Sequence, residues 1–312
     1  MAFEKAAGYQ NLPNGNFVPT IFSQKALKEF RKTSVVEDIT NTDYFGEISN
    51  FGDTVRIMRE PDIMITEYKR GQKVETQPLN DTDFTITVDK ANKFQFAIDD
   101  LEQKQSHVNF ETLASNKAAY ELRDAYDREV LNYLTTVAQA GNYLGTTTAA
   151  IRVATGATPN STTVFTPLGI MARVKRLMDV ANIPTDNRYL VADPVFYEQL
   201  NDENSKLLHN DFTDKGILRN GRISEGSVRG FKLYESNNLP TAGDGPDAAA
   251  ASDDYGVLVF GHPSAVATVS QISKTESFRS PDTFADVVRG LHMYGRGVIR
   301  PEALYVVRYA VR

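Results

Sequence analysis

The sequence predicts an α+β protein organised around one long helix, and three observations support this class. Residues 109–140 form the longest helical pattern in the chain, with no proline or glycine inside it. Before it, the stretches 53–58, 82–89 and 93–98 alternate apolar and polar residues, as half-buried strands do. After it, capped helical patterns are mixed with further strands, and no internal repeat is visible.

Composition excludes several classes of protein. The chain has 312 residues, of which 41% are hydrophobic, and this is enough for a real core. It contains no Cys, so disulfides, thiol catalysis and Cys-based zinc sites are excluded. A formal charge of −6 argues against a dedicated binder of duplex DNA. We expect neither a secretory signal nor a membrane-spanning helix, because no apolar run is long enough.

The first 35 residues are predicted to form an extended basic arm. Gly8, Pro13 and Pro19 favour turns and extended chain over a packed unit. A short amphipathic helix is expected at 23–33, and the arm carries more Lys and Arg than Glu. Such an arm needs a surface to lie on.

A long charged hairpin is predicted between the first two strands. Residues 59–81 are polar, carry charges of both signs and are interrupted by Pro61, Gly71 and Pro78. Because the alternation resumes on the far side, we interpret this stretch as a hairpin that projects from the body. A two-stranded hairpin is marginally stable alone in water, so something outside the subunit is expected to hold it.

The long helix is predicted to bury one face. Asn109 is a candidate N-cap, and Gly141 stands where helices commonly end. The apolar positions at helical spacing are Ala114, Ala118, Leu122, Ala125, Tyr126, Val130, Tyr133, Leu134 and Val137. The charged residues expected largely on the solvated side are Lys117, Glu121, Arg123, Asp124, Asp127 and Arg128.

The second half of the chain is predicted to mix helices and strands. Thr166 and Pro167 begin one helix, and Asp193 with Pro194 begin a second. Asn220 and Gly221 are typical of a hairpin turn, here within 217–223. Strands are expected at 151–153, 189–192, 228–234, 255–260, 265–272, 286–294 and 303–311.

Motifs of catalysis are missing from the sequence. His107, His209, His262 and His292 are scattered without metal-ligand spacing, and no phosphate-binding loop motif occurs. The densest acidic cluster is Asp99, Asp100 and Glu102. It could bind a divalent cation, but carboxylates are favoured before a helix in any case. We therefore expect no cofactor and no enzyme activity.

The order of the parts is informative: basic arm, charged hairpin, long helix, α+β region and returning strands. Within it stand the runs DYFGEISNFGDTVRI at 43–57, IDDLEQ at 98–103, and 264–304, which ends in an Arg-Pro-Glu element. Through these runs and their spacing, the chain resembles tailed-bacteriophage major capsid proteins with the Hong Kong 97-type fold. The resemblance covers nearly the whole length.

The resemblance implies a division of the chain into the named regions of that fold. Residues 1–35 resemble the N-arm, 36–50 the start of the P-domain, 51–93 the E-loop, 94–165 the P-domain with its spine helix at 109–140, 166–262 the A-domain, 263–299 the returning P-domain strands, and 300–312 the C-terminal strand of the A-domain.

The resemblance also implies a function and partners. The subunit would self-assemble from hexamers and pentamers into an icosahedral phage head that encloses double-stranded DNA. It would be made in the host bacterial cytoplasm and end in the virion. The expected partners are further copies, a portal, a scaffold protein and a decoration protein. No segment before the arm could serve as a scaffold, which implies a separate scaffold or none. Packaged DNA would be contacted weakly, because the chain is acidic.

The arm and the hairpin tip are the predicted intersubunit contacts. Their residues are Lys25, Lys28, Arg31, Lys32, Tyr68, Lys69, Arg70, Lys73 and Glu75. Two alternatives remain open at this stage. One is the shell of an encapsulin-type nanocompartment, and the other is an oligomeric enzyme or binding protein that uses Asp99, Asp100 and Glu102 with a metal.

Overall fold

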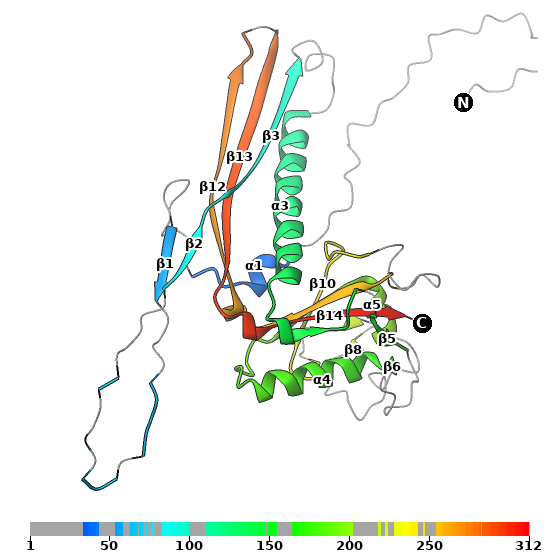
Figure 1. The fold of residues 1–312 in the computed structure, drawn as a ribbon. Helices are drawn as coiled ribbons and strands as arrows, with labels where there is room; N and C mark the ends of the chain where they lie inside the picture. The colour runs from blue at the N-terminus through cyan, green and yellow to red at the C-terminus, as the bar shows by residue number, and fades with distance from the viewer. Residues whose placement is uncertain are drawn as a thin grey trace, which may run out of the picture.

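The computed structural model describes residues 34–43, 54–58, 63–67, 69–71, 73, 76–77, 83–99, 110–147, 149–154, 164–201, 218–219, 222–223, 228–242, 246, 254–281 and 283–311. Two parts are evident in it: a long three-stranded sheet with a helix beside it, and a body built on a second sheet (Figure 1).

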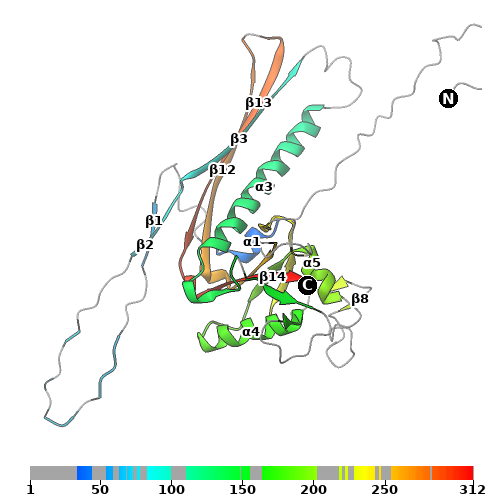
Figure 2. The same cartoon turned by 45° about the vertical axis from the view of Figure 1, so that its right-hand side comes forward.

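The three-stranded sheet, here called the blade, consists of β12 (Val266–Arg279), β13 (Ala285–Val298) and β3 (Lys90–Asp99). All three strands are antiparallel, with β13 in the middle. The helix α3 (Phe110–Thr136) runs along the blade in both views (Figures 1 and 2). Half-buried and exposed residues alternate along β3, because one face of the blade packs and the other meets solvent.

A separate two-stranded sheet leads into the blade. The strands β1 (Thr54–Met58) and β2 (Asp83–Thr87) pair antiparallel, and β3 follows β2 almost directly. A small core joins this sheet to the base of the blade; its buried residues are Ile86, Val88, Ala267 and Val269. The three strands predicted before the long helix are thus confirmed.

The body is a mixed seven-stranded sheet in the order β10-β7-β11-β14-β5-β6, with β4 also beside β14. Its strands are β4 (Tyr143–Leu144), β5 (Ile151–Val153), β6 (Val164–Phe165), β7 (Tyr189–Ala192), β10 (Lys232–Glu235), β11 (Gly256–Gly261) and β14 (Leu304–Val311). The C-terminal strand lies in the middle, antiparallel to β11 and parallel to β5. Every residue of β11 is buried, so this sheet forms the centre of the main core.

Two helices pack on the body and begin where the sequence predicts. Thr166 caps α4 (Pro167–Val180): its hydroxyl accepts a hydrogen bond from the Gly169 N–H at 3.1 Å. Asp193 caps α5 (Pro194–Asn201) by accepting from the Phe196 N–H at 3.4 Å. The predicted hairpin near Asn220 is also present, as the pair β8 (Leu218–Arg219) and β9 (Arg222–Ile223).

The long helix ends earlier than predicted, at Thr136 instead of near residue 140. The Thr135 hydroxyl donates to the carbonyl three residues back at 2.7 Å, which competes with further helix. The chain then turns into a 3-10 segment, η1 (Ala140–Asn142). There the Asn142 side chain donates to the carbonyls of Glu302 and Leu304, both at 3.0 Å. Anchoring at the start of β14 therefore sets the end of the helix.

The strand predicted at 228–234 begins only at Lys232. Arg229 and Gly230 have φ of 51° and 87°, and Val228 pairs with Phe231 across them, so these residues form a tight turn.

The strands β12 and β13 are longer than their predicted stretches. The strand β12 extends beyond its predicted stretch at its outer end, where Glu276 and Arg279 make the sequence look like a loop. The strand β13 extends at its base, where Gly295 and Gly297 weaken the strand pattern.

Two charged residues of α3 that were predicted to face solvent are buried instead. Asp124 is 9% exposed and Asp127 is fully buried, whereas Ala125, predicted on the buried face, is exposed. Buried hydrogen-bond donors from other segments explain this burial, as described below. The predicted helix at 23–33 falls outside the described residues. No helix within the described part of the chain is long and apolar enough to cross a membrane.

Candidate assembly surfaces

The chain between β1 and β2 continues as the predicted hairpin. The Gln77 side-chain amide makes two hydrogen bonds to the Met64 backbone. Its oxygen accepts from the Met64 N–H at 3.1 Å, and its nitrogen donates to the Met64 carbonyl at 2.8 Å. Farther out, Arg70 and Gly71 lie in a turn, and Gly71 has φ of 90°, in the region that favours glycine. These contacts hold the two sides of the hairpin together beyond the two-stranded sheet.

Apolar side chains of this hairpin face solvent. Ile63, Met64 and Ile65 are 71%, 74% and 98% exposed. Three consecutive apolar residues on a projecting hairpin are typical of a surface that is covered in an assembly. Among the predicted contact residues, Lys69, Arg70 and Lys73 are exposed on the same hairpin. The predicted contacts outside the described residues are Lys25, Lys28, Arg31, Lys32, Tyr68 and Glu75.

The outer end of the blade carries a second exposed apolar group. Phe284, in the connection between β12 and β13, is 81% exposed, and Phe278 is 39% exposed. The Arg289 guanidinium lies 5.1 Å from the centre of the Phe278 ring and also binds Glu276 at 2.6 Å. The sequence pattern missed this surface, because it did not extend β12 to these residues.

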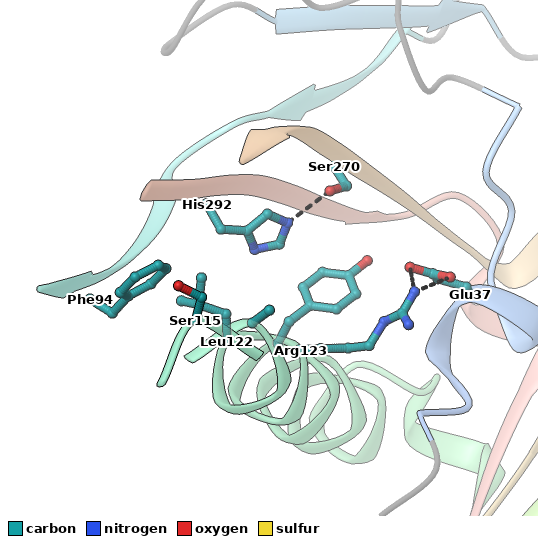
Figure 3. A pocket seen from close by; sticks show the side chains of 9 residues that line it. Glu37, Phe94, Ser115, Leu122, Arg123, Ser270 and His292 are labelled. Carbon is teal, nitrogen blue, oxygen red and sulfur yellow. Dashed lines mark hydrogen bonds and ion pairs between the residues drawn. The ribbon is translucent and has the colours of Figure 1, made fainter. Parts of the chain in front are cut away.

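A cavity of about 300 Å³ lies between α3 and the blade (Figure 3). Phe94 and Leu122 contribute apolar walls, and an ion pair of Arg123 with Glu37 at 3.1 Å stands on its other side. His292 lines it as well and is treated next. The helix α3, the blade and the segment that contains Glu37 thus meet around this cavity.

His292 is a packing residue. Its Nε2 shares a 2.8 Å hydrogen bond with the Ser270 hydroxyl, and its ring stacks on Tyr294 with the ring centres 5.5 Å apart. Burial lowers the pKa of His292 below its ordinary value, and the nearby Glu37 partly opposes this shift. His262 stabilises the chain next to it, because its Nδ1 accepts a hydrogen bond from the Ser264 N–H at 3.2 Å. The pKa of His262 is also lowered, mainly by burial and to a smaller extent by the positive charge of Arg188.

The acidic cluster before the long helix is only partly within the described residues. Asp99 lies exposed at the end of β3, whereas Asp100 and Glu102 fall outside. Among the residues that the structure describes, no three His, Asp or Glu side chains gather as metal ligands would.

A projecting hairpin, an elongated blade and exposed apolar ends are typical of a class of proteins, the subunits that bury further surface against other chains in an assembly. Comparison with known proteins gives the family. The sequence matches the family described as phage capsid protein over residues 81–307, and the chain belongs to that family. No curated protein matches the sequence.

Solved structures agree over nearly the whole chain. A protein of Mycobacterium phage Che8 is 28% identical, with a TM-score of 0.72, and the match covers 94% of this chain and 97% of that one. The capsid of the cyanophage P-SCSP1u is 19% identical with a TM-score of 0.71, covering 97% of each chain. The capsid of a native GTA particle is 13% identical with a TM-score of 0.68, covering 99% and 100%. The fold is therefore the Hong Kong 97-type fold predicted from the sequence.

The resemblance inferred from the sequence is thereby confirmed. The protein is a major capsid protein that associates with further copies to form the phage head shell, and it is a structural component of the virion.

Proposed function

We propose that the hairpin beyond β1 and β2, together with the basic arm, makes the contacts that hold neighbouring subunits in the shell. The exposure of Ile63, Met64 and Ile65 on a hairpin remote from the core carries this proposal. Burying them on a neighbour would recover the apolar area that the isolated subunit leaves in water. The charges of Lys69 and Arg70 at the tip would fix the register and limit wrong pairings.

The regions of the fold are assigned in the same proposal. The arm at 1–35 acts as the N-arm and the hairpin at 51–93 as the E-loop. The blade with α3 acts as the P-domain, and the seven-stranded body acts as the A-domain. This proposal moves two of the predicted boundaries: β4, β5 and β6, within the stretch 94–165 first given to the P-domain, join the A-domain sheet, and the start of β3 at 90–93 joins the blade. Each contact is weak alone, but many copies sum them into a stable closed lattice, while misplaced subunits can still dissociate.

Partners beyond the shell belong to this proposal as well. The head would be closed by a portal, built with a scaffold protein and bound by a decoration protein. It would enclose double-stranded DNA. The net charge of −6 supports weak, non-specific contact with that DNA, because an acidic wall attracts few phosphates.

Charge reversal at the hairpin tip tests the contact assignment. The double variant Lys69→Glu, Arg70→Glu should give a folded subunit that assembles poorly, as judged by sedimentation and electron microscopy. A matched control, Lys69→Arg with Arg70→Lys, keeps both charges and should assemble normally. Normal shells from the charge-reversed variant would refute the role of the tip.

A further inference from the structure

A buried carboxylate on α3 joins segments that are far apart in the sequence. Asp127 is fully buried. Its Oδ1 accepts hydrogen bonds from the Ser34 hydroxyl at 2.9 Å, the Val35 N–H at 3.0 Å and the Val36 N–H at 3.1 Å. Its Oδ2 accepts from Asn238 Nδ2 at 3.1 Å. Because donors approach both oxygens, a carboxylate suits this position and an amide does not.

The same Asn238 amide holds a second carboxylate one turn earlier on the helix. Asn238 Nδ2 donates to Asp124 Oδ1 at 2.8 Å, and the other Asp124 oxygen accepts from Arg128 at 2.8 Å. The Asn238 backbone N–H donates to the Ser236 hydroxyl at 3.2 Å, directly after β10. Asn238 therefore links the edge of the seven-stranded sheet to two positions on α3.

On the other side of Asp127, residues 34–41 form a segment that we call the strap. It contains the short helix α1 (Val36–Ile39), whose Val36 and Ile39 side chains are buried in the main core. At its far end, the Asn41 backbone N–H donates to the Val266 carbonyl at 2.9 Å, and the Asn41 backbone carbonyl accepts from the Thr268 N–H at 3.0 Å. The strap thus runs from α3 to the base of β12, and Figure 2 shows α1 beside the lower part of α3.

We propose that Asp127, Asn238 and the strap form a conformational lock that couples the point where the N-terminal arm enters the fold to the edge of the seven-stranded sheet. Asn238 acts as a positioning residue: it orients the Asp127 carboxylate, and that carboxylate fixes the first residues of the strap. Hydrogen bonds to an ionised acceptor are strong, and a buried donor left without its acceptor is costly. Loosening either side of the carboxylate therefore loosens the other.

The lock has a consequence for assembly. A displacement of the arm at Ser34 would reach the body of the subunit through one buried side chain. This consequence rests on the arm contacts proposed above, whereas the coupling itself is a property of the single subunit. Thermodynamic coupling is reciprocal, so the effect of the sheet side on the strap must be matched by the effect of the strap on the sheet side.

Amide hydrogen exchange in the unassembled full-length subunit tests the lock, measured residue by residue. Asn238→Ala should speed exchange at Val35 and Val36 by about tenfold, because Asn238 binds the Asp127 carboxylate that accepts from both N–H groups. Ser34→Ala should speed exchange at the Asn238 amide in return. The control is Arg123→Ala, which removes the exposed ion pair to Glu37 of the strap but leaves Asp127 untouched. It should change exchange at Val35 and Val36 by less than about twofold.

Unchanged exchange at Val35 and Val36 in folded Asn238→Ala overturns the lock. An equal rise at amides of α4 would also overturn it, because the variant would then have lost global stability only. Should Asn238→Ala fail to fold, the Ser34→Ala measurement at Asn238 decides alone. If arm variants still form normal shells, the proposed assembly contacts are refuted and the lock is not. If hydrogen exchange in the isolated subunit shows no coupling between Asn238 and the strap, only the lock is refuted.

Discussion

Arg296 on β13 binds the carboxylate of Glu129 on α3, and its guanidinium lies 4.4 Å from the centre of the Tyr133 ring. The side chains of Arg296 and Glu129 are 17% and 29% exposed, so solvent screens this pair less than a surface pair. Lys90 on β3 stands 4.0 Å from the same carboxylate. One acidic residue of the helix therefore ties it to two strands of the blade.

Removing this tie should destabilise the subunit. Arg296→Ala is expected to lower the free energy of unfolding by about 1–3 kcal/mol, because a partly buried carboxylate loses its main partner and a ring loses its cation. Arg279→Ala is the control, since its pair with Asp286 has side chains that are 49% and 53% exposed. That variant should change stability by less than about 1 kcal/mol. Urea unfolding measures both, and equal losses would contradict this account.

Gly295 on β13 should tolerate no side chain. A Cβ there would lie 2.6 Å from the Thr87 carbonyl oxygen of β2, and that backbone atom cannot swing away. We expect Gly295→Ala to cost about 1–3 kcal/mol through overpacking, seen as a lower melting temperature. Gly141→Ala is the matched control, because a Cβ at that position meets nothing within 4 Å. An unchanged melting temperature for Gly295→Ala would show that β2 does not pack against β13 as described.

His292 should make stability depend on pH. Burial lowers its folded-state pKa below the ordinary 6.5, so the unfolded chain binds the proton more readily than the folded one. Its contribution is therefore complete above pH 6.5 and is lost as the pH falls through the lowered pKa. His292→Gln should lose less stability than the wild type over that acidic interval, as measured by melting temperature at each pH. His262 stays in both proteins, so parallel curves would mean that His292 does not titrate in this way.

Sequence reasoning succeeded where a local pattern carries the information. Half-buried strands alternate because one face packs, and β3 shows this along its whole length. Thr166 and Asp193 predict the start of their helices correctly, because a capping side chain accepts its hydrogen bond from an N–H only three residues later in the sequence. The hairpin beyond β1 is also readable, because its charged residues stand between two alternating stretches.

Where the deciding contact comes from elsewhere in the chain, the sequence misleads. Asp127 reads as a solvated charge, yet its donors Ser34 and Asn238 stand 93 and 111 residues away. The end of α3 depends on Asn142 binding Leu304, 162 residues later. The outer end of the blade became visible only through pairing, since Arg279 faces Asp286 and Glu276 faces Arg289 across β12 and β13.

The central claim is that this chain builds a closed shell with copies of itself. Electron microscopy of the purified full-length chain, produced together with the products of its neighbouring genes, tests it most directly. We predict closed icosahedral particles tens of nanometres across whose wall consists of this protein. Small discrete oligomers in every preparation, with no closed particles, would contradict the account.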